Sequence, residues 1–190
     1  IIESLESNYK FKLFTKHELE KDFFKDVDGI VIGGGFGNSD SYDHLLKINK
    51  RVIKDFVHNG GKYIGICMGG WAGSDYFNLL HGCDTVQYIT RPNTDTRRPH
   101  AKNLDVVWNG NREKLFFYDG FAVTGWNYKT YASYMNGDPM AIIQNNIGII
   151  GCHPEATPHW YDSYSWMRGK FVNKQHLLLE FVDKVFEMPR

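Results

Sequence analysis

The sequence lacks an excess of charge of either sign. It carries 22 Lys and Arg against 22 Asp and Glu over 190 residues, so its formal net charge is zero. Because the two signs are interspersed, nothing in the charge pattern supports binding to nucleic acid or to a membrane surface. The one basic cluster lies between residues 91 and 102, and we interpret it as a solvated loop: Arg91, Arg97, Arg98, His100 and Lys102.

Long apolar runs and cysteines are scarce as well. No apolar run approaches the length that crosses a membrane, and no signal peptide is visible. The three cysteines, Cys67, Cys83 and Cys152, are an odd number, which argues against a disulfide framework and for a reducing compartment. We therefore expect a cytoplasmic protein without nucleic-acid or membrane partners.

The chain also lacks internal repeats, low-complexity tracts and linkers, so residues 1–190 are expected to form one domain. A strand at 28–32, an amphipathic helix at 43–59 and a strand at 62–66 follow one another, which is typical of a parallel α/β sheet. Short β-rich runs then occupy residues 84–150, and a helix at 174–186 closes the chain. We predict a mostly parallel central sheet with helices on both faces and a β-rich insertion in the second half.

The N-terminal part predicts three further elements. Residues 1–7 read as the tail of a helix, 9–14 alternate as a strand does, and a capping box at 15–18 opens a helix that runs to about residue 25. We expect a first strand upstream of Ile1.

The segment Gly65-Ile66-Cys67-Met68-Gly69 predicts a nucleophile on a sharp strand-to-helix turn. A residue at the tip of such a turn is forced into a strained backbone conformation, and glycines two positions before and after it relieve the crowding. The N-terminus of the following helix favours the thiolate form of Cys67. Its free N–H groups, first that of Met68, can stabilise an oxyanion.

A second segment, Cys152-His153-Pro154-Glu155, follows a strand pair at 139–144 and 147–151 that Asn145-Asn146 joins as a hairpin. His153 and Glu155 are two residues apart, so in extended chain both side chains lie on one face. Glu155 can therefore orient His153, although a simple surface pair also fits this spacing. Together with Cys67, they supply a nucleophile, a base and an orienting acid.

The glycine run at 33–37 follows the strand at 28–32. It lacks the Lys-Ser/Thr of a phosphate-binding loop and does not match G-x-G-x-x-G, so nucleotide binding is disfavoured. Because loops at the carboxyl ends of adjacent parallel strands meet in one crevice, Gly34 or Gly35 is expected to add N–H groups to the oxyanion hole beside Cys67. A plain tight turn is the alternative.

Other residues have weaker claims. A metal site made of Cys152, His153, Glu155 and His159 is disfavoured because the spacing fits no zinc pattern, so no metal or cofactor is expected. The aromatic side chains are more often core than ligand platform, and only Trp71 and Tyr118 are expected near the cleft.

These motifs, in this order, resemble the class I glutamine amidotransferase-like superfamily, whose members have a glycine-rich oxyanion loop, a G-x-C-x-G elbow and a late H-P-E. Within it, the run Gly60 to Gly70, Asn136-Gly137-Asp138-Pro139 and the strand before His153 are most similar to the amidotransferase-like domain at the N-terminus of some biotin–protein ligases. The resemblance covers about residues 28–155 and implies a flavodoxin-like fold.

The resemblance also implies that Cys67 attacks an amide carbonyl, His153 transfers the proton and Glu155 orients His153. This chain departs from the family's Pro-Gly-Gly loop, because it has Gly33-Gly34-Gly35, and Met68 narrows the pocket. The implied activity is a thiol hydrolase or amidotransferase that cleaves a C–N bond of a small amide or peptide through a thioester, with an ammonia-accepting or ligase-type partner protein. Two alternatives remain open: a small cysteine peptidase, and a non-catalytic regulatory or interaction domain.

Overall fold

The structure is a computed structural model, and it describes residues 1–15, 17, 21–34, 47 and 49–189. A seven-stranded sheet in the order β1-β2-β9-β8-β7-β4-β5 forms its centre. The strands are β1 Gly29–Ile32, β2 Lys62–Ile66, β4 Lys102–Trp108, β5 Asn111–Phe117, β7 Lys129–Tyr134, β8 Pro139–Gln144 and β9 Ile147–Ile150.

The parallel part of this sheet comprises β1, β2 and β9, and the remaining neighbours pair antiparallel. The predicted α/β class is confirmed, but the parallel pairing extends over fewer strands than predicted. The reason is local: β8 and β9 are joined by two residues, as are β4 and β5, and so short a connection permits only antiparallel pairing. Asn145, with φ +55°, makes the first of these turns.

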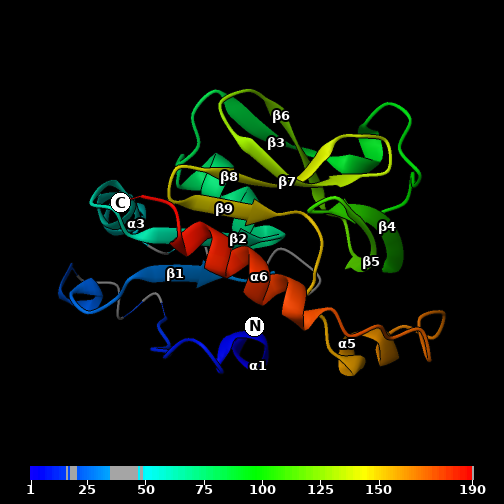
Figure 1. Cartoon of the computed structure of the whole chain (residues 1–190), viewed down its shortest axis with the longest axis horizontal. Coiled ribbons are helices and arrows are strands. Elements are labelled where there is room, and N and C mark those ends of the chain that lie inside the picture. Colours follow the sequence, from blue (N-terminus) through cyan, green and yellow to red (C-terminus); the bar gives the residue numbers. More distant parts are fainter. Residues whose placement is uncertain (16, 18–20, 35–46, 48, 190) are drawn as a thin grey trace.

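The predicted β-rich insertion is confirmed. It contains β4, β5 and β7 of the main sheet and a separate antiparallel pair, β3 Cys83–Gln87 and β6 Phe121–Gly125. This second sheet lies over β7 and β8 (Figure 1). The short helix η3, Tyr88–Thr90, follows β3.

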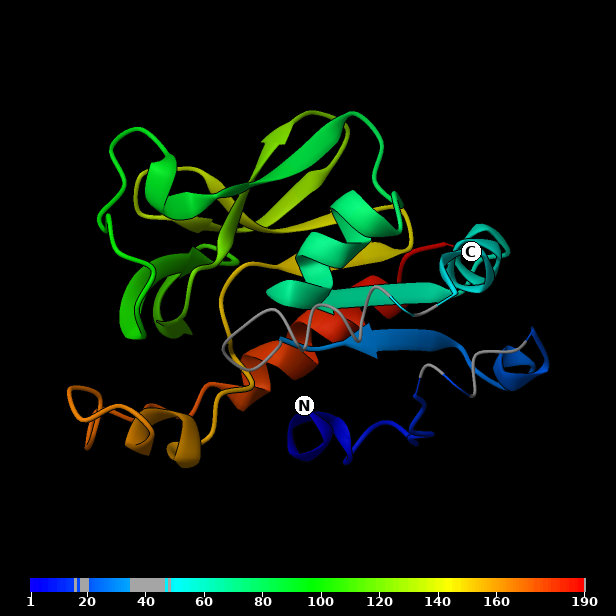
Figure 2. The ribbon, with the colours of Figure 1, turned by 180° about the vertical axis from the view of Figure 1, so that it is seen from behind.

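Helices cover both faces of the sheet, as predicted. On one face lie α6, Gln175–Phe186, and the short α1, Ile2–Leu5 (Figure 1). On the other lie α4, Met68–Trp71, and the π-helical turn η2, Ala72–Tyr76 (Figure 2). Residues of β2 alternate between the two sides: Ile64 and Ile66 pack with α6, whereas Tyr63 packs with α3, Lys50–His58. All of β2 is buried, which makes it a rigid base for the elbow that follows.

Two N-terminal predictions need correction or lie partly outside the described residues. Residues 9–14 form no strand, because a cavity separates them from the edge strand β1 and they do not pair with it; Tyr9 is held instead by a hydrogen bond from its hydroxyl to Asp183 at 2.6 Å. Of the helix predicted at 15–25, residues 16 and 18–20 are outside the description, and the rest contains only the 3-10 helix η1, Lys21–Phe24.

The helix predicted at 43–59 is shorter than expected. It begins at Lys50, because Asn49 has an extended backbone and its side chain accepts a hydrogen bond from the Arg51 N–H at 3.2 Å, which is an N-cap. Residues 43–46 and 48 are not described. Gly60, with φ +92°, follows the end of the helix in the left-handed conformation that glycine favours.

Candidate active site

Cys67 occupies the turn between β2 and α4 in a strained conformation, with φ +49° and ψ −106°. A non-glycine residue at positive φ persists only where its surroundings hold it there. Here the Cys67 N–H donates to the carbonyl of Ile150 at 2.7 Å, and its own carbonyl accepts from the Trp71 N–H at 3.0 Å. The neighbouring strand β9 and the helix after Cys67 therefore fix its backbone, and the side chain remains half-buried at the tip.

The two glycines of the elbow allow this close turn. A β-carbon at Gly65 would lie 2.5 Å from the carbonyl oxygen of Gly69, and one at Gly69 would lie 2.0 Å from the carbonyl oxygen of Ile32. Both contacts are with backbone, so no side chain can move aside. The G-x-C-x-G spacing thus has the steric reason that the sequence predicts.

His153 and Glu155 form a buried pair just beyond β9. The backbone N–H of His153 donates to the carbonyl of Phe116 at 2.8 Å, which connects this segment to the end of β5. Nδ1–H of the imidazole donates to Oε1 of Glu155 at 2.9 Å, and each side chain is only 3% exposed. Because Nδ1 is engaged, Nε2 is the nitrogen that can exchange a proton with a nucleophile. The surface-pair alternative is incompatible with this burial.

The charge state of His153 depends on its two neighbours. Burial alone lowers the pKa of an imidazole, but the negative charges of the Glu155 carboxylate and of a Cys67 thiolate act in the opposite direction and raise the pKa of His153 above its ordinary value. A side-chain hydrogen bond between Cys67 and His153 also contributes to this increase in the pKa. The structure therefore brings Cys67, His153 and Glu155 together, in an environment that favours the imidazolium.

The second oxygen of Glu155 differs from the first. Oε2 is buried and has no hydrogen-bond partner among the residues that the structure describes. Cys67 has a further contact, since its thiol donates to the carbonyl oxygen of Tyr118 at 3.7 Å.

The predicted oxyanion residues lie beside this group as far as they are described. A β-carbon at Gly34 would lie 2.5 Å from Cε1 of His153, so the loop after β1 packs against the imidazole. Met68 opens α4 directly after Cys67. Within the described ranges, neither the Gly34 nor the Met68 N–H donates to another backbone group. Gly35 lies outside the described residues.

The two predicted pocket aromatics differ in position. Tyr118 lies next to Cys67 through its carbonyl, and its ring stacks on Tyr164 with centroids 6.0 Å apart. The Trp71 ring packs edge-on against Phe121 at 5.7 Å. Sequence reasoning missed Trp160, whose ring centroid lies 4.9 Å from that of His153. The available signal was its position seven residues after His153, in an aromatic run that was assigned to the core.

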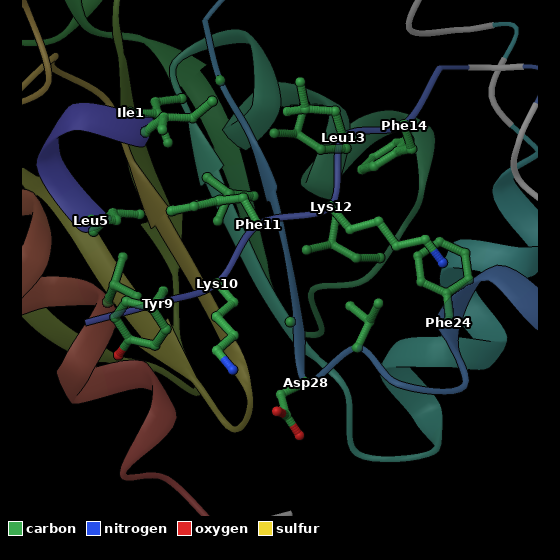
Figure 3. Close-up of a pocket in the computed structure, with 18 of the residues that line it drawn as sticks. Ile1, Leu5, Tyr9, Lys10, Phe11, Lys12, Leu13, Phe14, Phe24 and Asp28 are labelled. Atoms are coloured by element: carbon green, nitrogen blue, oxygen red, sulfur yellow. The ribbon is translucent and has the colours of Figure 1, made fainter. Parts of the chain in front are cut away.

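A large cavity in the described part of the chain does not include the triad. It is a cavity of about 900 Å³ between residues 8–14, β1 and α6, lined mainly by apolar side chains (Figure 3). Its lining includes Gly34 and Met68 but none of Cys67, His153 and Glu155. The cavity therefore borders Gly34 and Met68 and does not contain the nucleophile.

Two kinds of feature are absent from the described residues. No group of three or more His, Cys, Asp or Glu side chains is placed to hold a metal ion. No described helix is both long enough and apolar enough to span a bilayer.

Part of the chain is similar to a known protein family. Residues 1–91 match the family model described as "Biotin-protein ligase, N terminal". A comparison with curated proteins found no match.

Solved structures resemble the whole chain. A glutamine amidotransferase matches with a TM-score of 0.66 at 15% identity, covering 97% of this chain and 91% of that one. Another glutamine amidotransferase, from Thermotoga maritima, matches with a TM-score of 0.56 at 14% identity, covering 84% and 78%. The glutaminase domain of Trypanosoma brucei CTPS matches with a TM-score of 0.50 at 14% identity, covering 100% and 85%. The chain therefore has the fold of these glutamine amidotransferases, and its residues 1–91 are similar to the N-terminal domain of biotin–protein ligases.

Proposed function

We propose that this chain is a cysteine-dependent hydrolase of the glutaminase or amidase type, which cleaves a C–N bond through a thioester. The observation that carries the proposal is the meeting of a strained elbow cysteine, Cys67, with the buried His153–Glu155 pair. A structural cysteine needs neither a strained turn nor a base. A nucleophilic cysteine needs both, because the turn exposes its side chain and the base activates its thiol.

The first half-reaction forms the thioester. The proton of Cys67 passes to Nε2 of His153, and the thiolate attacks the amide carbonyl carbon. The N–H groups of Met68 and of the loop at Gly34, with Gly35 as a further expected donor, stabilise the oxyanion. As the C–N bond breaks, the imidazolium gives its proton to the departing nitrogen, so that ammonia or an amine leaves and the acyl group stays on Cys67.

The second half-reaction returns the free enzyme. His153, now neutral, takes a proton from water as the water oxygen attacks the thioester carbonyl. The C–S bond then breaks, the carboxylic acid leaves, and Cys67 recovers its proton. Glu155 keeps the imidazole in one tautomer and stabilises its positive form throughout.

The substrate class is a small amide or a short peptide. With an amide side chain such as that of glutamine, the departing group is ammonia, and a partner protein of the ammonia-accepting or ligase type would use it. The fold supports this class because the structural neighbours include a glutaminase domain. We further propose that the protein needs no metal or other cofactor, because the two half-reactions use only protein groups and water.

Intact-mass spectrometry with thioester trapping tests the proposal. Wild-type protein is mixed with a panel of amides and short peptides, and with a glutamine-analogue electrophile, and is then quenched in acid. The expected result is an adduct that maps to Cys67 and is absent from Cys67→Ala. A folded wild-type protein that forms no adduct with any member would support the non-catalytic alternative, whereas adducts with peptides alone would favour the peptidase.

A further inference from the structure

The helix α5, Pro158–Asp162, places a large aromatic side chain against the candidate base. The ring centroids of Trp160 and His153 are 4.9 Å apart, and the ring planes are tilted by 60°. The Phe116 ring packs edge-on against the same imidazole, with centroids 6.0 Å apart. The centroids of the Trp160 and Phe116 rings are 5.6 Å apart. Gly34 is also adjacent, so uncharged groups surround the imidazole apart from its contacts with Glu155 and Cys67.

Trp160 is held in this position by its neighbours in the chain. Pro158 starts α5, and the backbone N–H of Trp160 donates to the carbonyl of Thr157 at 3.0 Å. The next residue, Tyr161, anchors α5: it is buried, contacts Phe116 at 5.1 Å, and its hydroxyl donates to Asn103 at 2.8 Å. Trp160 itself remains half-buried, so packing alone does not account for an indole at this position.

We propose that Trp160 is a positioning residue for the acyl-transfer site: its ring confines the His153 imidazole so that Nε2 faces Cys67, and it stabilises the positively charged form of that imidazole. The role rests on the proposed function in so far as His153 serves as the base. The hydrogen bond from Nδ1 to Glu155 fixes one point of the ring, and the contact with the indole restricts its remaining tilt.

The electrostatics support the same assignment. The groups whose charge acts on His153 are Glu155, on its own segment, and Cys67, from the elbow. The side chains packed on it from β5 and α5, Phe116 and Trp160, cannot ionise. The quadrupole of an aromatic ring attracts a cation that lies over the face of the ring, and indole does so best. Trp160 can thus favour the imidazolium without adding a second titrating group.

Titration of His153 by NMR tests the proposal without reference to turnover. The proteins are the wild type, Trp160→Phe, Trp160→Leu and a matched control, Trp166→Leu, with the His153 signal identified from its loss in His153→Gln. Trp166 lies on the same segment, is 52% exposed and contacts Tyr164 and the Ala101 carbonyl rather than His153. We expect the His153 midpoint to fall by about half to one pH unit in Trp160→Leu, by less in Trp160→Phe, and not at all in Trp166→Leu.

Alkylation of Cys67 gives the second readout. Near pH 6 the rate should fall several-fold in Trp160→Leu, recover in large part in Trp160→Phe, and stay unchanged in Trp166→Leu. Equal midpoints and equal rates in the wild type and the Trp160 variants would overturn the proposal. If Trp160→Leu does not fold, Trp160→Phe decides alone: a lowered midpoint supports the role, and an unchanged one overturns it. Failure of the proposed function would be distinguishable: the Trp160 variants would still change the His153 midpoint and the Cys67 alkylation rate as expected, but the wild-type protein would form no thioester.

Discussion

The turn after β2 and the turn after β9 each present part of the candidate triad, but different physical means hold the two parts in place. Cys67 is held by its backbone, which is strained at φ +49° and fixed by hydrogen bonds to Ile150 and Trp71. His153 and Glu155 are held by their side chains, which are 3% exposed and bonded to each other at 2.9 Å.

The two turns therefore differ in the substitutions that they tolerate. At the elbow the side chain contributes little to packing, so its chemistry can be removed while the fold remains. At the second turn chemistry and packing depend on the same atoms, because removing either partner leaves a buried polar group unpaired. Substitutions at the two turns should therefore separate activity from stability at Cys67 and couple them at His153 and Glu155.

The largest effect is expected at Cys67. Cys67→Ala should abolish hydrolysis of any amide that forms the adduct, by about 10⁴-fold or more, because no other group can form the thioester. Its melting temperature should stay close to that of the wild type. Parallel activity assays and thermal melts check this, and full activity in a folded Cys67→Ala would contradict the assignment of the nucleophile.

Glu155→Ala should have the next largest effect. We expect a loss of about 10²–10⁴-fold in turnover, because the base loses its orienting acid but the nucleophile remains. Unlike Cys67→Ala, this change should also lower the melting temperature, since it leaves the buried Nδ1–H of His153 without an acceptor. A Glu155→Ala protein as stable as the wild type would contradict the distinction between the two turns.

The loop after β1 allows a comparison of adjacent glycines. Gly34→Ala should reduce turnover by about 10²-fold, because its methyl group would lie 2.5 Å from Cε1 of His153 and displace the ring. Gly33→Ala is the matched control, since its methyl group would meet only the end of the Ile1 side chain, which can move. Equal losses in the two variants, measured by steady-state kinetics, would show that the loop does not position the base.

A smaller effect concerns the three thiols. Iodoacetamide near neutral pH should modify Cys67 before Cys83 and Cys152, because burial raises the pKa of both of the other thiols while Cys67 is half-buried beside His153. Peptide mapping after short labelling gives the order. Faster labelling of Cys83 or Cys152 would remove the argument for an activated elbow cysteine.

The smallest effect is on the pH dependence of stability. Because folding raises the pKa of His153, its contribution to stability is complete below the unfolded-state pKa of about 6.5 and is lost as pH rises through the folded-state pKa. The melting temperature of the wild type should therefore exceed that of His153→Gln by a few degrees near pH 6, and this gap should shrink towards alkaline pH. A gap that widens with pH would mean that His153 is neutral in the folded protein.

The parts of the site that depend on local chain geometry were predictable from the sequence. The strands β2, Lys62–Ile66, and β8, Pro139–Gln144, have the predicted bounds, and β9, Ile147–Ile150, ends one residue before the predicted end at 151. The glycine spacing around Cys67 also has a local steric cause. Short-range patterns of this kind contain the information needed for a turn, a hairpin or a buried strand.

Features that depend on distant contacts were not predictable in the same way. Residues 9–14 alternate like a strand, yet pairing requires a neighbouring strand that their own sequence does not specify. The burial of Glu155 and the contact of Trp160 with His153 arise from α5 and β5 packing around the second turn. The helix before β2 begins at Lys50, where Asn49 caps it, and the predicted start at residue 43 lies outside the described residues.

The coupling between the two turns is the central claim, and the rate of Cys67 alkylation measured from pH 5 to pH 9 in the wild type and in His153→Gln tests it most directly. If His153 holds the proton of Cys67, the wild type should react much faster than the variant near pH 6, and the two rates should converge at alkaline pH, where the thiolate forms without help. Identical pH–rate profiles in two folded proteins would contradict the claim.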